Sequence, residues 1–134
     1  MRLWHKDLID YLPRQQLISQ WRECCCIAKN IASKGTPNHI LVNKILDYPL
    51  NHFYTYGIDV YMAMKSRGYE CDFNKFDKYF KDMPLPKEPI FKDWHNERYL
   101  KQCYYNLQEK YDCNTIPKKE WKIFASKFYE LTNN

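Results

Sequence analysis

Apolar residues recur every three or four positions through most of the first 35 residues of this chain. Spacings of four and three place such side chains on one face of an α-helix, and a helix of this length must bury that whole face. Asp10 can cap the helix, Pro13 fits its first turn, and Gly35 followed by Pro37 ends it. The sequence therefore predicts one long N-terminal helix, with this buried stripe: Leu17, Trp21, Cys24, Ala28 and Ile31.

The rest of the chain favours more helices packed around the first. Only three glycines occur in 134 residues, and helical periods recur throughout, which argues against a sandwich or a barrel. We expect further helices over residues 38–47, 50–67, 72–81 and 93–113, the last capped by Asp93, and one after Pro117. The predicted fold is all-α: a single compact domain of about five to six helices spanning residues 1–134. A proline-rich connector at about 83–91 is expected to cross it as a strap.

Charge and cysteine content restrict the possible partners. The net charge of +5 is scattered along the chain and is compatible with nucleic acid, though it favours it only weakly. The opening residues carry too many charges for a signal peptide, and no apolar run is long enough to cross a membrane, so we expect a cytoplasmic protein. No CxxC pair occurs, and neighbouring residues of the triplet 24–26 would point about 100° apart on a helix. We therefore expect reduced thiols and no metal.

One carboxylate of the first helix lies among cations, in a segment close to the α-amino group of the chain. Gln15, Arg22, Cys26 and Lys29 share one stripe, and Glu23 lies one step round the helix. An Arg-Glu pair alone is typical of an ordinary exposed surface. An α-amine, however, loses its proton more readily than a lysine side chain, and beside a carboxylate it can attack an aldehyde-like carbon.

Several blocks of the chain resemble the pyrimidine-dimer DNA glycosylase family. The most specific block begins with Arg2-Leu3 and continues through Leu12, Gln15 and Leu17 into Trp21-Arg22-Glu23. Weaker similarity lies in Asn38-His39 leading to Asp47, in the segment 64–69 (MKSRGY), and in the aromatic and lysine residues of 121–129. The resemblance implies an all-α DNA glycosylase and abasic-site lyase that requires no cofactor. In that family an N-terminal amine forms an imine with the sugar of a damaged pyrimidine, and β-elimination then nicks the strand.

The resemblance also implies roles for individual residues. Glu23 corresponds to the essential glutamate, Arg22 to its neighbouring phosphate-binding arginine, Gln15 to the glutamine of the first helix, and Arg2 to the N-terminal arginine. Because residue 2 is large, we expect Met1 to be retained and to supply the amine.

The remaining DNA contacts are expected from other basic or polar side chains. Arg14 would hold a backbone phosphate, and His39 lies in the second similar block. Residue 26 is cysteine where the family has a basic residue, so Lys29 or Lys44 would supply that contact.

The resemblance implies a DNA repair enzyme that acts as a monomer on double-stranded damaged DNA. Its substrate could be a cyclobutane pyrimidine dimer, another damaged pyrimidine or an abasic site, with the dimer as the first choice. The alternative is a non-catalytic nucleic-acid-binding domain on the same scaffold. A third reading is a protein-interaction module that uses the aromatic surface.

Overall fold

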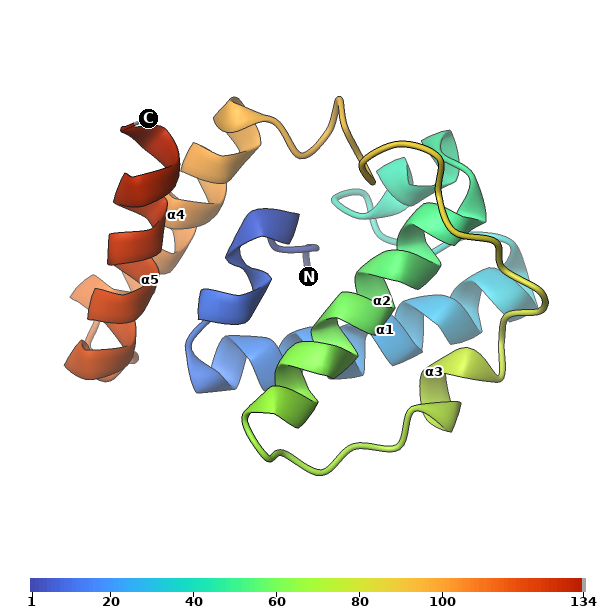
Figure 1. Cartoon of the computed structure of the whole chain (residues 1–134), viewed down its shortest axis with the longest axis horizontal. Helices are drawn as coiled ribbons and strands as arrows, with labels where there is room; N and C mark the ends of the chain where they lie inside the picture. Colours follow the sequence, from blue (N-terminus) through green and yellow to red (C-terminus); the bar gives the residue numbers. More distant parts are fainter. Residues whose placement is uncertain (134) are drawn as a thin grey trace.

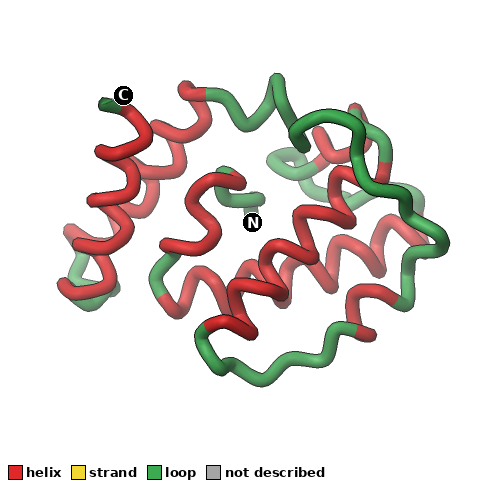
Figure 2. Tube along the Cα trace, in the orientation of Figure 1, coloured by secondary structure: helices red, strands yellow, loops and turns green. Residues whose placement is uncertain are grey.

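The computed structural model describes residues 1–133 and is all-helical over that range, as the sequence predicts (Figures 1 and 2). Two of the helices, labelled η, are short 3-10 helices. None of the helices within residues 1–133 has the length and apolar character needed to span a bilayer. The elements are η1 (Lys6–Tyr11), α1 (Arg14–Lys34), η2 (Asn43–Asp47), α2 (Leu50–Ser66), α3 (Asn74–Asp77), α4 (Glu97–Asp112) and α5 (Lys118–Thr132).

Helix α1 has the predicted stripe and the predicted end. Leu17, Trp21, Cys24 and Ala28 are buried, Ile31 is half-buried, and Gly35 closes the helix at a φ of 73°. The predicted start is wrong, because Asp10 lies inside η1 and caps nothing. Pro13 is itself the N-cap residue, with extended backbone, and the first free amide of α1, on Arg14, donates 2.6 Å to Oε1 of Glu120 in α5.

Two helix pairs enclose the N-terminal segment. Helix α1 packs against α2, and α4 packs against α5, where the rings of Tyr104 and Phe128 stack 3.9 Å apart. The 3-10 helix η1 contacts both α2 and α5, so the first residues of the chain lie between the two pairs (Figure 1). The segment that carries the α-amine is therefore held in the fold from Leu3 onward, where residues 3–5 are buried, while Met1 itself is exposed.

Three predicted helices differ from the structure. The helix predicted over 38–47 is reduced to η2, and the one over 72–81 is reduced to α3, whose Phe76 is fully buried against Gly57. Asp93 does not cap α4; residues before α4 form turns that bury Trp94, and the Asn96 side chain accepts from the Tyr99 amide at 2.9 Å. At α3 and before α4 the backbone turns where an aromatic side chain, Phe76 or Trp94, is buried, so tertiary packing overrides local helix preference there.

Candidate functional site

A cavity of about 280 Å³ lies where the N-terminal segment meets α1 and α4. We call it the Glu23 cavity. Its walls come from three parts of the chain that are far apart in sequence. The residues that line it are Met1, Arg2 and Trp4; Gln15, Gln16, Ser19 and Glu23 of α1; and Asn106 and Lys110 of α4.

One buried side chain, Gln20, attaches the N-terminal segment to α1. Its amide nitrogen donates to the Arg2 carbonyl at 3.0 Å and to Oε2 of Glu23 at 3.1 Å. Its amide oxygen accepts from the Trp4 backbone amide at 2.7 Å and from the Tyr56 hydroxyl at 2.9 Å. Gln20 is fully buried; its bonds to Trp4 and Tyr56 are buried, and those to Arg2 and Glu23 are partly buried. They fix the backbone of residues 2–4 relative to the Glu23 carboxylate.

The Glu23 carboxylate is half-buried, and burial and nearby positive charges shift its pKa in opposite directions. Burial raises the pKa of its carboxyl group, because the charged form loses water. The positive charge of the chain's amino terminus acts in the opposite direction and is the largest of the opposing effects, followed by Lys110 and His39. The carboxylate thus lies within electrostatic reach of the Met1 amine and of cations from two other parts of the chain.

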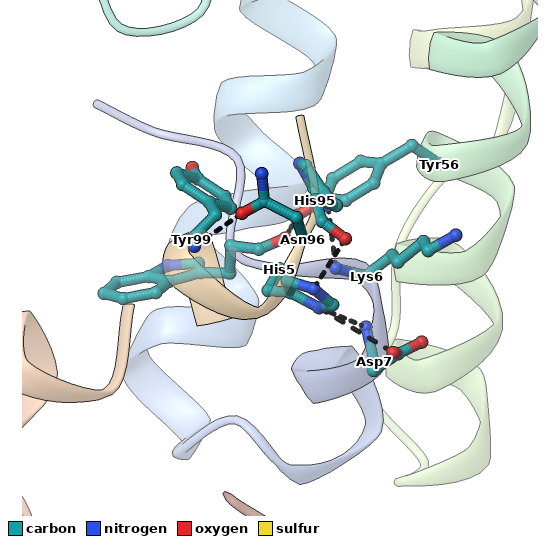
Figure 3. A network of polar contacts seen from close by, with 8 residues as sticks. His5, Lys6, Asp7, Tyr56, His95, Asn96 and Tyr99 are labelled. Carbon is teal, nitrogen blue, oxygen red and sulfur yellow. Dashed lines mark hydrogen bonds and ion pairs between the residues drawn. The ribbon is translucent and has the colours of Figure 1, made fainter. Parts of the chain in front are cut away.

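A second set of contacts holds the N-terminal segment from the side of α4 (Figure 3). The His5 ring donates from Nε2 to the His95 carbonyl at 2.9 Å, and the Lys6 amide donates to Nδ1 of His95 at 3.0 Å. The Tyr99 hydroxyl donates to the Leu3 carbonyl at 2.5 Å. Burial lowers the pKa of both histidines, that of His95 to about 2, so the rings are neutral at physiological pH.

The structure brings some of the predicted site residues together and separates others. Met1, Arg2, Gln15 and Glu23 all line the Glu23 cavity, and His39 lies close enough for its charge to affect Glu23. Three predicted residues lie elsewhere.

Arg14, Arg22 and Lys44 do not line the Glu23 cavity. The Arg14 guanidinium lies 5.5 Å from the centre of the Tyr69 ring, toward the end of α2. Arg22 is exposed on α1 next to Glu23. Lys44 lines a neighbouring hollow together with Arg98. Contacts from these three side chains to a ligand in the cavity would need a ligand that extends well beyond it.

Sequence reasoning missed Gln20, Asn106 and Lys110. Gln20 is three residues before Glu23, so the helical period alone places it on a neighbouring face, and this spacing was an available signal. Asn106 and Lys110 reach the cavity only because α4 docks beside the N-terminal segment. No local pattern in the sequence indicates that contact.

The cysteines and histidines offer no metal centre in the part of the chain that the structure describes. No group of three or more His, Cys, Asp or Glu side chains within residues 1–133 is arranged to hold a metal ion. Cys24 and Cys103 are buried, and burial raises the pKa of the Cys25 thiol to about 11. These thiols are therefore protonated, as expected for small apolar packing residues.

Comparison with known proteins gives one family. The family profile described as pyrimidine dimer DNA glycosylase matches residues 1–77, which is more than half of the 134-residue chain. The matched segment contains η1, α1, η2 and α2. No curated protein and no solved structure matches the chain.

Proposed function

The chain belongs to the pyrimidine dimer DNA glycosylase family, and we propose that it removes a damaged pyrimidine from DNA and then nicks the strand. The observation that supports the proposal is that Met1 and Glu23 line the same cavity and that the positive charge of the amino terminus acts on the Glu23 carboxyl group. Such a pair has the two functions that imine chemistry at a sugar carbon requires, a nucleophile and a proton carrier.

In the proposed reaction the Met1 nitrogen attacks C1′ of the damaged nucleotide. The nitrogen lone pair forms the new C–N bond, and the electrons of the glycosidic bond leave with the base, which takes up a proton. Loss of the amine proton and opening of the C1′–O4′ bond, with protonation of O4′, give the imine. Removal of a proton from C2′ then expels the 3′ phosphate oxygen, and water releases the enzyme from the sugar.

The Glu23 carboxylate would act in two of these steps. As the base leaves, positive charge develops on the sugar, and an ionised carboxylate beside it stabilises that charge. The raised pKa of Glu23 also suits proton transfer, because a half-buried carboxyl exchanges its proton closer to neutral pH than an exposed one. The hydrogen bond from Gln20 would keep the carboxylate oriented toward the amine.

The cations around the cavity would bind the phosphates of the damaged strand. Arg2 and Lys110 line the cavity itself, whereas Arg22 and Lys44 lie outside it. Contacts of this kind orient DNA without reading its sequence, which suits an enzyme that recognises damage. The nucleotide must leave the stack to reach the cavity, and this costs least where a base is already damaged or poorly stacked. A cyclobutane pyrimidine dimer in duplex DNA is the proposed substrate.

Borohydride trapping tests the proposal, because borohydride reduces an imine to a stable covalent link. The wild-type chain should be trapped on duplexes that carry a dimer or an abasic site, and not on undamaged duplex. Trapping should be lost when the N-terminus is acetylated or extended by a few residues, and in Glu23→Gln. Glu70→Gln, an exposed carboxylate after α2, is the matched control and should trap like the wild type.

Two outcomes would contradict the proposal. Trapping that survives both a blocked N-terminus and Glu23→Gln would show that another amine does the chemistry. Salt-sensitive DNA binding without any trapping or nicking would instead support the non-catalytic DNA-binding alternative.

A further inference from the structure

The Glu23 cavity continues into a groove along α4. The next hollow, about 240 Å³, shares Arg2 and Asn106 with the cavity and adds Leu41, Tyr99 and Gln102. A third hollow, about 310 Å³, shares Leu41, Tyr99 and Gln102 with the second and extends to Lys44 and Arg98. Because each hollow shares side chains with the next, the three lie next to one another along α4. We call the second and third hollows the α4 groove.

Two apolar side chains project at the edge of this groove. Ile40 is 84% exposed and Leu41 is 50% exposed, both in the loop between α1 and α2. Both line the third hollow, and Leu41 also lines the second. The loop reaches toward the N-terminal segment, since Leu41 and Arg2 line the same hollow. The exposed apolar surface therefore lies beside the proposed DNA path rather than on a remote face.

The loop that carries Ile40 and Leu41 is firmly held. The Asn43 side chain accepts from the His39 amide at 3.1 Å, and the Leu41 amide donates to Nδ1 of His39 at 3.2 Å. The neighbouring Val42 is fully buried and anchors the loop in the core. The loop backbone is thus held by hydrogen bonds and by the buried Val42, while the large apolar side chains of Ile40 and Leu41 remain exposed to water.

The charges around these side chains fit a nucleic acid. Lys44 and Arg98 line the third hollow together with Ile40 and Leu41, and Arg2 lines the second hollow. Asp93 is the single acidic side chain in the lining of these two hollows. An apolar tip between cations matches a duplex, whose phosphates lie outside and whose apolar base faces lie inside. Proteins that distort DNA insert apolar side chains between base steps in this way.

We propose that Ile40 and Leu41 form a wedge that enters the base stack of the duplex beside the extruded nucleotide. This inference rests on the proposed function for the identity of its ligand, double-stranded damaged DNA. The wedge would fill the space that the extruded nucleotide leaves and keep that nucleotide from returning to the stack. It should matter for duplex DNA and not for a single strand, in which no stack has to be opened.

Fluorescence of 2-aminopurine, which rises when the base is unstacked, tests the wedge without any turnover. The probe is a duplex with a tetrahydrofuran abasic analogue and 2-aminopurine next to it, and the full-length protein carries Glu23→Gln. The parent should raise the fluorescence on binding. The added double substitution Ile40→Ala/Leu41→Ala should abolish most of this rise and weaken duplex binding by about tenfold, while binding to the same single strand changes less than about twofold.

Two further variants control for the loss of apolar surface. Leu85→Ala removes an equally exposed leucine, 84% exposed, from the proline-rich connector, and it should leave the fluorescence rise unchanged. The exchange Ile40→Leu/Leu41→Ile keeps the apolar volume and should retain the rise. If the alanine pair unstacks the duplex as well as its parent does, or if Leu85→Ala loses the rise equally, the wedge is wrong.

Borohydride trapping with Glu23 intact separates this inference from the proposed chemistry. The alanine pair should still be trapped on a single-stranded abasic oligonucleotide at the wild-type rate. If the protein is trapped but its fluorescence rise does not depend on residues 40 and 41, the wedge is refuted and the proposed chemistry is supported. If the fluorescence rise depends on residues 40 and 41 but the protein is never trapped by borohydride, the proposed chemistry is refuted and the wedge is supported.

Discussion

Replacement of Gln20 by methionine should loosen the N-terminal segment from α1. Methionine keeps the length and nearly the volume of glutamine but cannot make its four hydrogen bonds. The Trp4 backbone amide and the Arg2 carbonyl, at 2.7 Å and 3.0 Å from the Gln20 side chain, would lose their partner there. The Tyr56 hydroxyl would keep its bond to the Trp4 carbonyl.

The expected cost follows from these two backbone groups. A buried polar group left without a partner costs about 1–3 kcal/mol. The Trp4 amide is in a buried bond, while the Arg2 carbonyl is only partly buried, so the sum should be about 2–4 kcal/mol of unfolding free energy. The catalytic effect should be larger in relative terms, because a displacement of about 1 Å between reacting groups can reduce a rate by about 100-fold.

Urea unfolding and the single-turnover trapping rate on abasic duplex measure the two effects. Gln16→Met is the matched control for stability, because Gln16 is also a buried glutamine of α1 but its Oε1 has no hydrogen-bond partner within the described residues. That variant should unfold within about 0.5 kcal/mol of the wild type or be slightly more stable. If Gln20→Met kept both the urea midpoint and the trapping rate of the wild type, Gln20 would not be what positions the amine.

Three further predictions concern pH and packing. Lys110→Met should move the acid limb of the trapping rate to higher pH, because loss of a nearby cation raises the Glu23 pKa further; an unchanged pH profile would refute the coupling. Gly57→Ala should lower the unfolding free energy measured in urea by about 1–3 kcal/mol, since its Cβ would meet Cζ of Phe76 at 2.1 Å. The pKa of His95, about 2 in the folded protein, is far below that of the unfolded chain, so the unfolded state binds the extra proton. Stability should therefore fall below about pH 6.5, by about 1 kcal/mol per pH unit, and His95→Gln should flatten that slope in a urea-unfolding series.

The helices with clear local signals were predictable from sequence. Helices α1, α2 and α5 each combine an apolar stripe with a proline just before the helix begins, at Pro13, Pro49 and Pro117. The failures lie where aromatic residues fill gaps between elements. Phe76 packs so closely on Gly57 that α3 is limited to a short turn around it, and no single-segment pattern could indicate this contact.

Some residues of the candidate site were predictable from the sequence, and others were not. Met1 and Glu23 were predicted to meet because the family resemblance pairs an N-terminal amine with the glutamate of the first helix, and both residues line the same cavity. Arg22 was predicted beside the same site, but the helical turn between neighbouring residues carries it to an exposed face outside the cavity. Asn106 and Lys110 could not be predicted, since their place depends on how α4 docks more than 80 residues away along the chain.

The position of positive charge is where this chain departs most from its family resemblance. The resemblance implies a basic residue at the position of Cys26, which is exposed on α1, so α1 offers no second cation one turn after Glu23 on that stripe. Lys110 of α4 acts on the Glu23 carboxylate instead and lines the same cavity. This lysine lies beyond the segment that matches the family, which ends at residue 77. If the proposed chemistry holds, the amine and the carboxylate come from the family segment while α4 supplies the charge that balances them, and the second half of the chain is then part of the active site rather than only a cover for the core.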